Sequence, residues 1–293
     1  MNLLALKNRI KSVKNIGQVT KAMELVAATK MRRAQQRALD ARFYTSELKS
    51  LMRKLLVDGS LSDFDLAKEN VNAKKNLLII VGPSKGLAGP LVSNLSREAY
   101  KYLLANPDTD LIALDKKGVY LAEKSGKDII AAIDYIKTSI EQEDLEGVFR
   151  IIKEEYTKGT YKKVSVVFTH FINTLVQKPM VTDILPITID SINSGFVKSD
   201  EDNNMTDILI EPGKTEVLEQ LFNQFFENTL FLSVLDSISS EYSARMIAMK
   251  NAGDNAKELK EDLTLEYNQS RQAAITQQIL EIAGATAAME SSD

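Results

Sequence analysis

Apolar and small side chains recur at a helical spacing at both ends of the chain. Twelve such positions lie between Leu3 and Ala41, in eleven steps over 38 residues, and twelve more lie between Leu235 and Ala274, over 39 residues. Both sets average about 3.5 residues per step, the period at which two helices share an apolar seam. Ile16 and Leu259 are among these seam positions.

This spacing predicts two long helices, over about 3–56 and about 215–289, with the first ending at 57–60 and Thr215 as the N-cap of the second. The helices should pack antiparallel, because a whole domain lies between them.

The middle of the chain alternates between apolar runs and helical patterns. Residues 76–82 form a continuous apolar run, typical of a strand buried on both faces. The alternation predicts a parallel sheet covered by helices, with one or two more strands between 171 and 189, antiparallel at the edge. Residues 190–204 should be a flexible connector. The other expected strands are 110–114, 129–133 and 163–168, and the expected helices are about 91–103, 116–124 and 145–156.

The predicted fold class is therefore α/β: a long antiparallel coiled coil of N- and C-terminal helices plus a central Rossmann-like α/β domain. The expected segments are residues 1–58 for the first helix, 75–195 for the central domain and 207–293 for the second helix.

Charge supports the pairing of the two helices. Residues 1–57 hold 13 Lys/Arg and 3 Asp/Glu, a net charge of +10, whereas residues 207–293 hold 6 and 15, a net charge of −9. The overall charge of −3 conceals this asymmetry.

Composition excludes several classes of protein. The chain has no cysteine and one histidine, which rules out disulfides, thiolate metal sites and histidine clusters. No apolar run approaches the roughly 18–20 residues of a membrane span, and the heptad pattern begins at once without a leader. We expect a cytosolic protein, or one that reaches a membrane only through partners.

Candidate chemistry is sparse. The loop 82–89 follows the first strand, where a doubly wound domain binds phosphate, but it matches neither the dinucleotide fingerprint nor the Walker A pattern. A structural turn is favoured there over nucleotide binding. A structural role is likewise favoured for His170, which has no Asp/Ser grouping near it in sequence. Acidic residues gather at a helix start, where they suit the helix dipole. They are Glu141, Glu143, Asp144 and Glu146. No catalytic, cofactor-binding or metal residue is predicted.

Basic side chains lie along the first helix, and three interpretations of them remain open. It is a solvated flank of the coiled coil, a nucleic-acid-binding arm, or a surface for an acidic protein partner. The nucleic-acid interpretation lacks interleaved aromatic residues, since residues 1–42 contain none. An enzyme with a coiled-coil dimerisation arm is a further alternative. The run comprises Lys7, Arg9, Lys11, Lys14, Lys21, Lys30, Arg32, Arg33 and Arg37.

Helix length favours a protein partner. The first helix would be roughly 80 Å long and the second roughly 110 Å, at 1.5 Å per residue. Antiparallel pairing then places residue 3 opposite about residue 268, so the last 20 or so residues extend beyond the first helix. This tip contains Ile275, Ile279, Leu280 and Ile282, which indicates that another protein encloses it.

Motifs at both ends resemble those of the gamma subunit of F-type ATP synthase. The N-terminal match is Ile10–Val13 with Thr20–Lys30. The C-terminal matches are Ser240–Ala252, Leu265–Thr276 and Glu281–Ala285. The resemblance spans the whole architecture.

The resemblance implies a non-catalytic rotor without cofactors. Its coiled coil would turn inside a ring of alpha and beta subunits. Its α/β domain would form a foot on the epsilon subunit and the c-ring. Ion transport through the c-ring would thereby drive ATP synthesis in the beta subunits. The implied location is peripheral, on the cytoplasmic face of the bacterial inner membrane, with membrane contact only through partners and no role for nucleic acid.

The resemblance also implies contacts with the ring. Basic residues of the first helix would face acidic segments of the beta subunits, and the C-terminal tip would turn in an apolar collar. Met23 would be a flexible contact, although packing in the helix seam explains it equally well, as it does Met246. The implied ring-binding residues are Lys11, Lys14, Lys21, Met23, Lys30, Arg32, Arg33, Arg245, Arg271, Gln272, Thr276, Ile279 and Ile282.

The sequence departs from the family pattern in two places. The foot loop usually carries an Asp and a Cys, but here it reads Ser84–Gly89 with Lys85 and Ala88. Gln278 stands where a Glu is common. The absence of cysteine excludes the redox regulation found in one branch of the family.

Overall fold

The computed structural model describes residues 3–56, 61, 64–194 and 210–290. The chain forms two compact units, of which unit 1 comprises residues 1–27 and 246–293 and unit 2 comprises residues 28–245. The predicted segment boundaries at 58, 195 and 207 and the predicted end of the first helix at 57–60 lie outside the described residues.

Two long helices run through both units: α1 (Leu3–Leu56) and α6 (Lys214–Glu290). They confirm the two helices predicted from the seam spacing. Thr215 is not the N-cap of α6, because it lies inside the first turn and the carbonyl of Gly213 accepts the first helical hydrogen bond, from Val217 N at 3.1 Å. No helix in the described ranges has the length and apolar character needed to cross a membrane.

In unit 1, α1 and α6 pack antiparallel along a small apolar core. A Cβ added to Gly17 would lie 3.6 Å from the Cβ of Ala256, and one added to Gly253 would lie 3.3 Å from Oγ1 of Thr20. Three steps forward along α1 thus match three steps back along α6. The core contains Leu6, Val13, Ala256 and Leu263, with Ile10 and Tyr267 packed against it.

The predicted seam positions are buried or partly buried, except Ile16 and Leu259. They are 54% and 41% exposed. Gly17, rather than Ile16, faces α6, since its position lies opposite Ala256.

The antiparallel pairing continues within unit 2. Asn228 Nδ2 donates to Oγ1 of Thr45 at 2.6 Å, and Lys30 Nζ donates to the hydroxyl of Tyr242 at 3.4 Å. Moving from residue 30 to 45 on α1 corresponds to moving from 242 to 228 on α6, so the two helices advance at nearly equal rates here too.

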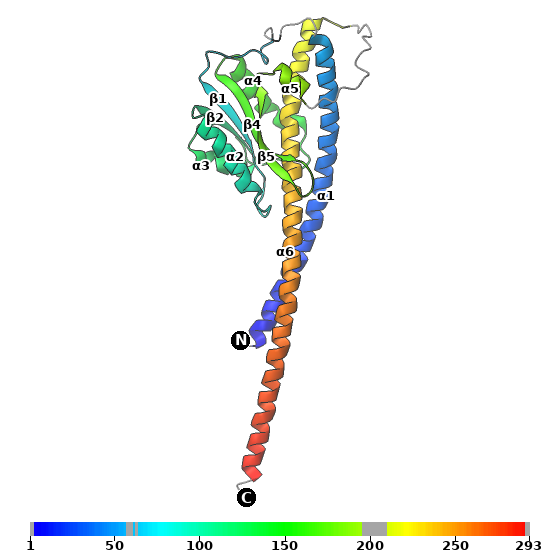
Figure 1. Ribbon diagram of the computed structural model, residues 1–293, viewed down its shortest axis with the longest axis vertical. Coiled ribbons are helices and arrows are strands. Elements are labelled where there is room, and N and C mark those ends of the chain that lie inside the picture. The colour runs from blue at the N-terminus through cyan, green and yellow to red at the C-terminus, as the bar shows by residue number, and fades with distance from the viewer. Residues whose placement is uncertain (1–2, 57–60, 62–63, 195–209, 291–293) are drawn as a thin grey trace. The chain divides into compact units, whose positions relative to one another are not determined.

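Unit 2 contains a five-stranded sheet in the order β3-β2-β1-β4-β5 (Figure 1). Strands β1 to β4 are parallel, and β5 joins the edge antiparallel to β4, as predicted. The strands are β1 (Lys75–Val81), β2 (Thr109–Leu114), β3 (Ile129–Ile133), β4 (Tyr161–Phe171) and β5 (Gln177–Leu185).

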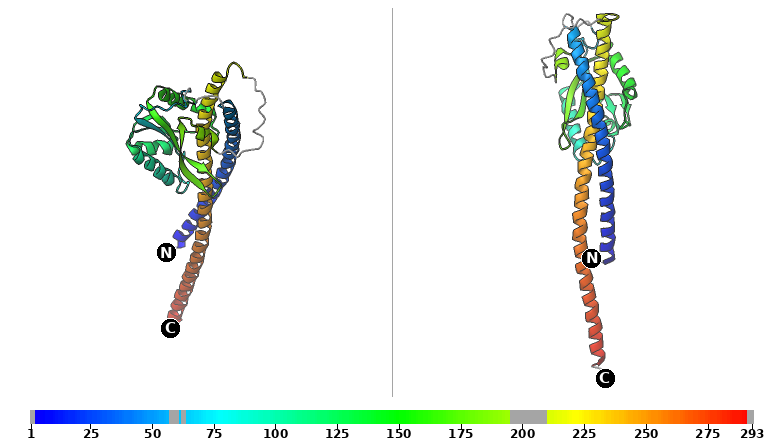
Figure 2. Two further views of the ribbon diagram at one scale, coloured as in Figure 1. Left: turned by 45° about the horizontal axis from the view of Figure 1, so that its top comes forward. Right: turned by 90° about the vertical axis from the view of Figure 1, so that its right-hand side faces the viewer.

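Helices cover both faces of this sheet, which explains the continuous apolar run of β1. Leu78 and Ile80 face α2 (Leu91–Ala105) and α3 (Lys116–Ser125), whereas Leu77 and Ile79 belong to the core shared with α4 (Glu146–Thr157), α1 and α6. Figures 1 and 2 show α2 and α3 on one side of the sheet.

The predicted connector 190–204 is partly helical. Residues 189–193 form the short helix α5 (Ile189–Asn193), whose buried Ile192 joins the larger core. Thr188 and Ser191 cap it reciprocally, which explains why a Ser- and Asp-containing stretch is ordered there. Residues 195–204 lie outside the described ranges.

Candidate functional site

The predicted basic contact residues lie on the surface of α1. Lys11, Lys14, Lys21, Arg32 and Arg33 are exposed. Lys21 also pairs with Glu24 at 3.0 Å, one turn along the same helix. These side chains form no part of either helix seam, so they remain available to a partner.

Met23 and Lys30 are partly covered. Met23 is half-buried in unit 1. Lys30 lies in unit 2 with its Nζ 5.3 Å from the ring centroid of Tyr242, a cation–π contact. Both side chains are therefore partly committed to contacts within the chain.

The end of α6 carries exposed aliphatic side chains. Ile275, Ile279, Leu280 and Ile282 are 47%, 60%, 64% and 68% exposed. Figure 1 shows α6 continuing well past the N-terminal end of α1, as the length argument predicted. The other predicted contact residues of this segment, Arg271, Gln272 and Thr276, are also exposed.

Arg245 differs from the other predicted ring contacts, because it is buried within unit 2. It is only 6% exposed, and its guanidinium donates to Glu241 Oε1 at 2.6 Å, one helical turn earlier. It also donates to the carbonyl of Lys85 at 3.0 Å and to that of Gly86 at 3.2 Å. Its positive charge and its N–H donors therefore bind groups of the same chain.

Glu241 binds the same loop by accepting hydrogen bonds from the loop's backbone N–H groups and from a serine hydroxyl. Its carboxylate accepts hydrogen bonds from Ser84 N at 2.9 Å, Ser84 Oγ at 3.0 Å and Lys85 N at 3.4 Å. Glu241 is 3% exposed. We call the set Glu241, Arg245 and Ser84–Gly86 the latch.

Close backbone packing surrounds the latch. A Cβ on Gly82, at the end of β1, would lie 2.0 Å from the backbone nitrogen of Gly118, at the start of α3. Only glycine permits this approach. Leu87 and Asp115 both have positive φ, of 61° and 67°, which non-glycine residues rarely adopt. The loop is therefore held in a constrained conformation.

Asp115 adds a second buried carboxyl group beside the latch. It is 3% exposed and accepts from the backbone nitrogen of Lys116, capping α3. Burial, together with the negative charge of Glu241, raises the pKa of Asp115 to about 7, although backbone hydrogen bonds oppose the shift. Arg245 neutralises Glu241, whereas Asp115 has no such ion pair among the described contacts.

Serine residues of α6 also form hydrogen bonds with the end of β4 and with the hairpin that follows it. Ser237 Oγ accepts from Thr169 N at 3.1 Å, and Ser240 Oγ donates to the carbonyl of Thr169 at 2.9 Å. Ser243 Oγ donates to the carbonyl of Thr174 at 2.8 Å, in the hairpin between β4 and β5. One stretch of α6 thus satisfies loops at the carboxyl end of the sheet.

His170 is hydrogen-bonded within unit 2, to a partner that was not found from sequence. Its Nδ1 lies 2.6 Å from Oδ2 of Asp236, whose other oxygen accepts from Arg42 at 2.6 Å. These three side chains connect β4, α6 and α1.

The acidic residues before α4 cap a short 3₁₀ helix, in which Glu141 and Asp144 exchange hydrogen bonds with each other's backbone amides.

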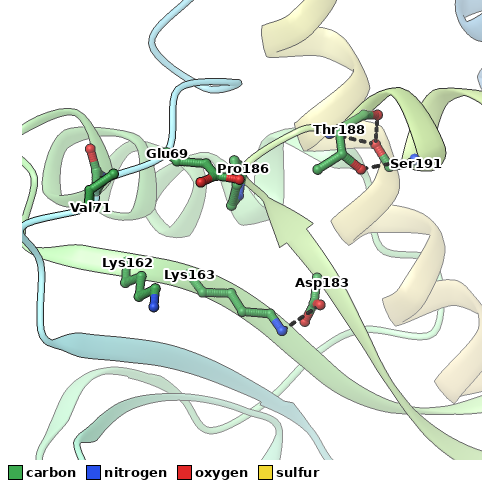
Figure 3. Close-up of a pocket in the computed structure, with 9 residues that line it drawn as sticks. Glu69, Val71, Lys162, Lys163, Asp183, Pro186, Thr188 and Ser191 are labelled. Atoms are coloured by element: carbon green, nitrogen blue, oxygen red, sulfur yellow. Dashed lines mark hydrogen bonds and ion pairs between the residues drawn. The ribbon is translucent and has the colours of Figure 1, made fainter. Parts of the chain in front are cut away.

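Two surface hollows are large enough for a small ligand. One of about 760 Å³ adjoins the latch and is lined by Lys116, Lys117, Tyr120 and other side chains. Another, of about 410 Å³, lies beside β4 and β5, and Figure 3 shows Lys163 paired with Asp183 inside it. Its lining is mixed in charge, with Lys162 and Glu69 as well, so we assign it no ligand. No group of three His, Cys, Asp or Glu side chains in the described part of the chain could hold a metal ion.

The comparisons with known proteins agree along the whole chain. A family model described as ATP synthase matches residues 2–289. The ATP synthase gamma chain of Roseiflexus sp. (strain RS-1) is 37% identical over 294 residues, covering 97% of each chain. That of Herpetosiphon aurantiacus is 39% identical over 294 residues, covering 96% of this chain and 97% of the relative.

Solved structures share the fold. The chain resembles one from the Euglena gracilis mitochondrial ATP synthase, OSCP/F1/c-ring, in rotational state 3, with a TM-score of 0.67, 19% identity, and coverage of 99% and 95%. It also resembles one from the central stalk/c-ring of the Tetrahymena thermophila mitochondrial ATP synthase, with a TM-score of 0.60, 21% identity, and coverage of 80% and 99%. With terminal helices that pair antiparallel, an α/β domain between them in sequence and relatives matched from end to end, the chain belongs to the ATP synthase gamma chain family.

Proposed function

We propose that this protein is the central rotor of an ATP synthase and is not catalytic by itself. Its paired helices turn inside a ring of alpha and beta subunits, and its α/β domain meets the epsilon subunit and the c-ring. Rotation driven by ion transport would change the conformation of the catalytic beta subunits in turn.

The exposed tip of α6 carries this proposal. Four large aliphatic side chains at 275, 279, 280 and 282 are 47–68% exposed. A helix with such a surface is stabilised when another protein surrounds it. An apolar collar without directional bonds also permits rotation, because no hydrogen bond has to break at each step.

The basic surface of α1 supports an acidic partner. Five exposed cations lie away from the seam. Exposed ion pairs are each worth only about 0–1 kcal/mol, so they can exchange as the rotor turns. The residues that we propose to contact the ring, whether through charge or through apolar surface, are Lys11, Lys14, Lys21, Met23, Lys30, Arg32, Arg33, Arg271, Gln272, Thr276, Ile279 and Ile282. Arg245 is left out, since its guanidinium lies in the latch.

The location follows from these partners. The protein would be peripheral, on the cytoplasmic face of the bacterial inner membrane, and would touch the membrane only through the c-ring assembly.

Co-expression with alpha and beta subunits tests the proposal. We expect a complex with one copy of this chain for every six ring subunits. A chain ending at Thr276 should keep a folded α/β domain, measured by circular dichroism, but should assemble less well or transmit less torque. Normal assembly and normal coupling of ion transport to ATP synthesis in the truncated protein would contradict the proposed role of the tip.

A further inference from the structure

The loop after β1 has the geometry of an anion-binding loop. In doubly wound domains, backbone N–H groups at the carboxyl ends of strands commonly hold a phosphate. Here the N–H groups of Ser84 and Lys85 and the hydroxyl of Ser84 all donate to a single carboxylate, that of Glu241. The anion comes from the chain itself.

The surroundings of Glu241 match those of a bound anion. The side chain is almost fully buried, and Arg245 supplies the neutralising charge at 2.6 Å. Arg245 also occupies the carbonyl oxygens of Lys85 and Gly86. Two residues one turn apart on α6 therefore bind the N–H groups of Ser84 and Lys85 and the carbonyl groups of Lys85 and Gly86.

We propose that Ser84–Gly86 is an anion-binding loop whose permanent anion is the carboxylate of Glu241, and that the resulting latch is the joint through which the α/β domain turns α6. The second half of this statement rests on the proposed rotor function.

The latch has the properties that such a joint requires. Its hydrogen bonds are directional and charge-assisted, and the side chains of Glu241 and Arg245 are buried, unlike the exposed ion pairs on α1. The backbone next to it is constrained at Gly82, Leu87 and Asp115, so the loop cannot easily move independently of the sheet. Ser237, Ser240 and Ser243, which form hydrogen bonds with the end of β4 and with its hairpin, lie on the same stretch of α6.

Hydrogen exchange of the full chain tests the anion-binding loop. In Glu241→Ala, the amide exchange rates of Ser84 and Lys85 should rise about tenfold or more, because hydrogen bonds to a charged acceptor are lost. Sodium acetate or inorganic phosphate should slow that exchange again and raise the unfolding midpoint of this variant. Neither anion should act in this way on the unmodified chain.

Two variants control the measurement. Lys85→Ala should exchange like the unmodified chain, since Lys85 contributes only backbone atoms to the latch. Glu241→Gln keeps the shape of the side chain but removes its charge, and it provides the same readout if Glu241→Ala does not fold. Unchanged exchange at Ser84 and Lys85 in both Glu241 variants, or an equal effect of acetate on the unmodified chain, would overturn the proposal.

The joint is tested in the assembled complex in membrane vesicles. Glu241→Ala combined with Arg245→Ala should retain ATP hydrolysis but lose ion-driven ATP synthesis. Glu227→Gln removes an acid of α6 that pairs with Lys153 on α4 at 2.9 Å, away from the loop, and should leave synthesis unchanged. Full synthesis by the double variant would overturn the joint alone, whereas failure of the unmodified chain to join the ring would overturn the rotor function.

Discussion

The carboxylate of Asp236 on α6 accepts a hydrogen bond from the guanidinium of Arg42 on α1 at 2.6 Å. Asp236 is buried, with 4% of its side chain exposed, whereas Arg42 retains access to water at 38%. His170 binds the second oxygen of Asp236 at 2.6 Å. One carboxylate therefore fixes both long helices to β4 within unit 2.

We expect Asp236→Ala to lower the free energy of unfolding by about 2–3 kcal/mol, below the range for a fully buried pair because Arg42 and His170 can turn to water. Chemical denaturation of the full chain measures it. Lys158→Ala, which breaks an exposed pair with Glu155, is the control and should cost much less stability, because exposed pairs contribute little. Equal losses in the two variants would contradict this account.

The helix register in unit 1 can be tested with a disulfide. An added Cβ at Gly17 lies 3.6 Å from the Cβ of Ala256, within the range of roughly 3.5–4.5 Å between the β-carbons of a disulfide. Gly17→Cys with Ala256→Cys should therefore oxidise rapidly to a linked pair, detected by loss of free thiols. The chain has no native cysteine to interfere.

Gly17→Cys with Leu259→Cys is the matched control for this disulfide. Leu259 is 41% exposed and lies off the seam, so this pair should stay reduced under the same conditions. Preferential linkage of this pair would show that the register is wrong.

The close approach of Gly82 to Gly118 predicts that alanine destabilises the chain at position 82 but not at position 86. Gly82→Ala would place a methyl group 2.0 Å from a backbone nitrogen and should destabilise unit 2 by about 3 kcal/mol or more. Gly86→Ala meets no atom within 4 Å and should change the stability by no more than about 0.5 kcal/mol. Thermal unfolding of both variants measures the difference, and similar midpoints would contradict the packing.

Asp115 predicts a pH dependence of stability. Its folded-state pKa is raised to about 7, chiefly by burial, so the folded chain holds a proton that the unfolded chain releases near the ordinary aspartate pKa of 3.8. The stabilisation is complete below about pH 4 and is lost as the pH rises through 7. At 1.36 kcal/mol per pKa unit, it amounts to at most about 4 kcal/mol.

Asp115→Asn should remove this dependence while keeping an acceptor for the amide of Lys116. In urea unfolding, the variant should be more stable than the unmodified chain at pH 8, and the difference should shrink towards pH 5. Parallel stability curves for the two proteins would show that Asp115 does not titrate in this range.

The elements and their order could be predicted from the sequence, because the seam spacing and the apolar runs are local signals. The antiparallel edge strand and the overhanging tip of α6 followed from the same signals and from helix length. Ile16 was misplaced because a spacing of 3.5 does not show whether the bulky residue or the glycine next to it faces the partner helix.

The latch could not be predicted in the same way. Glu241 and Ser84 are 157 residues apart, and only the fold brings them together. Arg245 was predicted from a motif to contact the ring. It is buried instead because the loop after β1 lies against it, and only the fold shows this. The departure of that loop from known phosphate-binding patterns was the available signal, and its meaning required the position of α6.

The equal stepping of α1 and α6 constrains how the termini can evolve. If a full turn is deleted from one helix on the paired stretch, the partner must shorten by the same amount, or every contact beyond that point changes neighbour. Insertions and deletions at the two ends should therefore occur in matched pairs, while the domain between them and the overhanging tip remain free to vary in length.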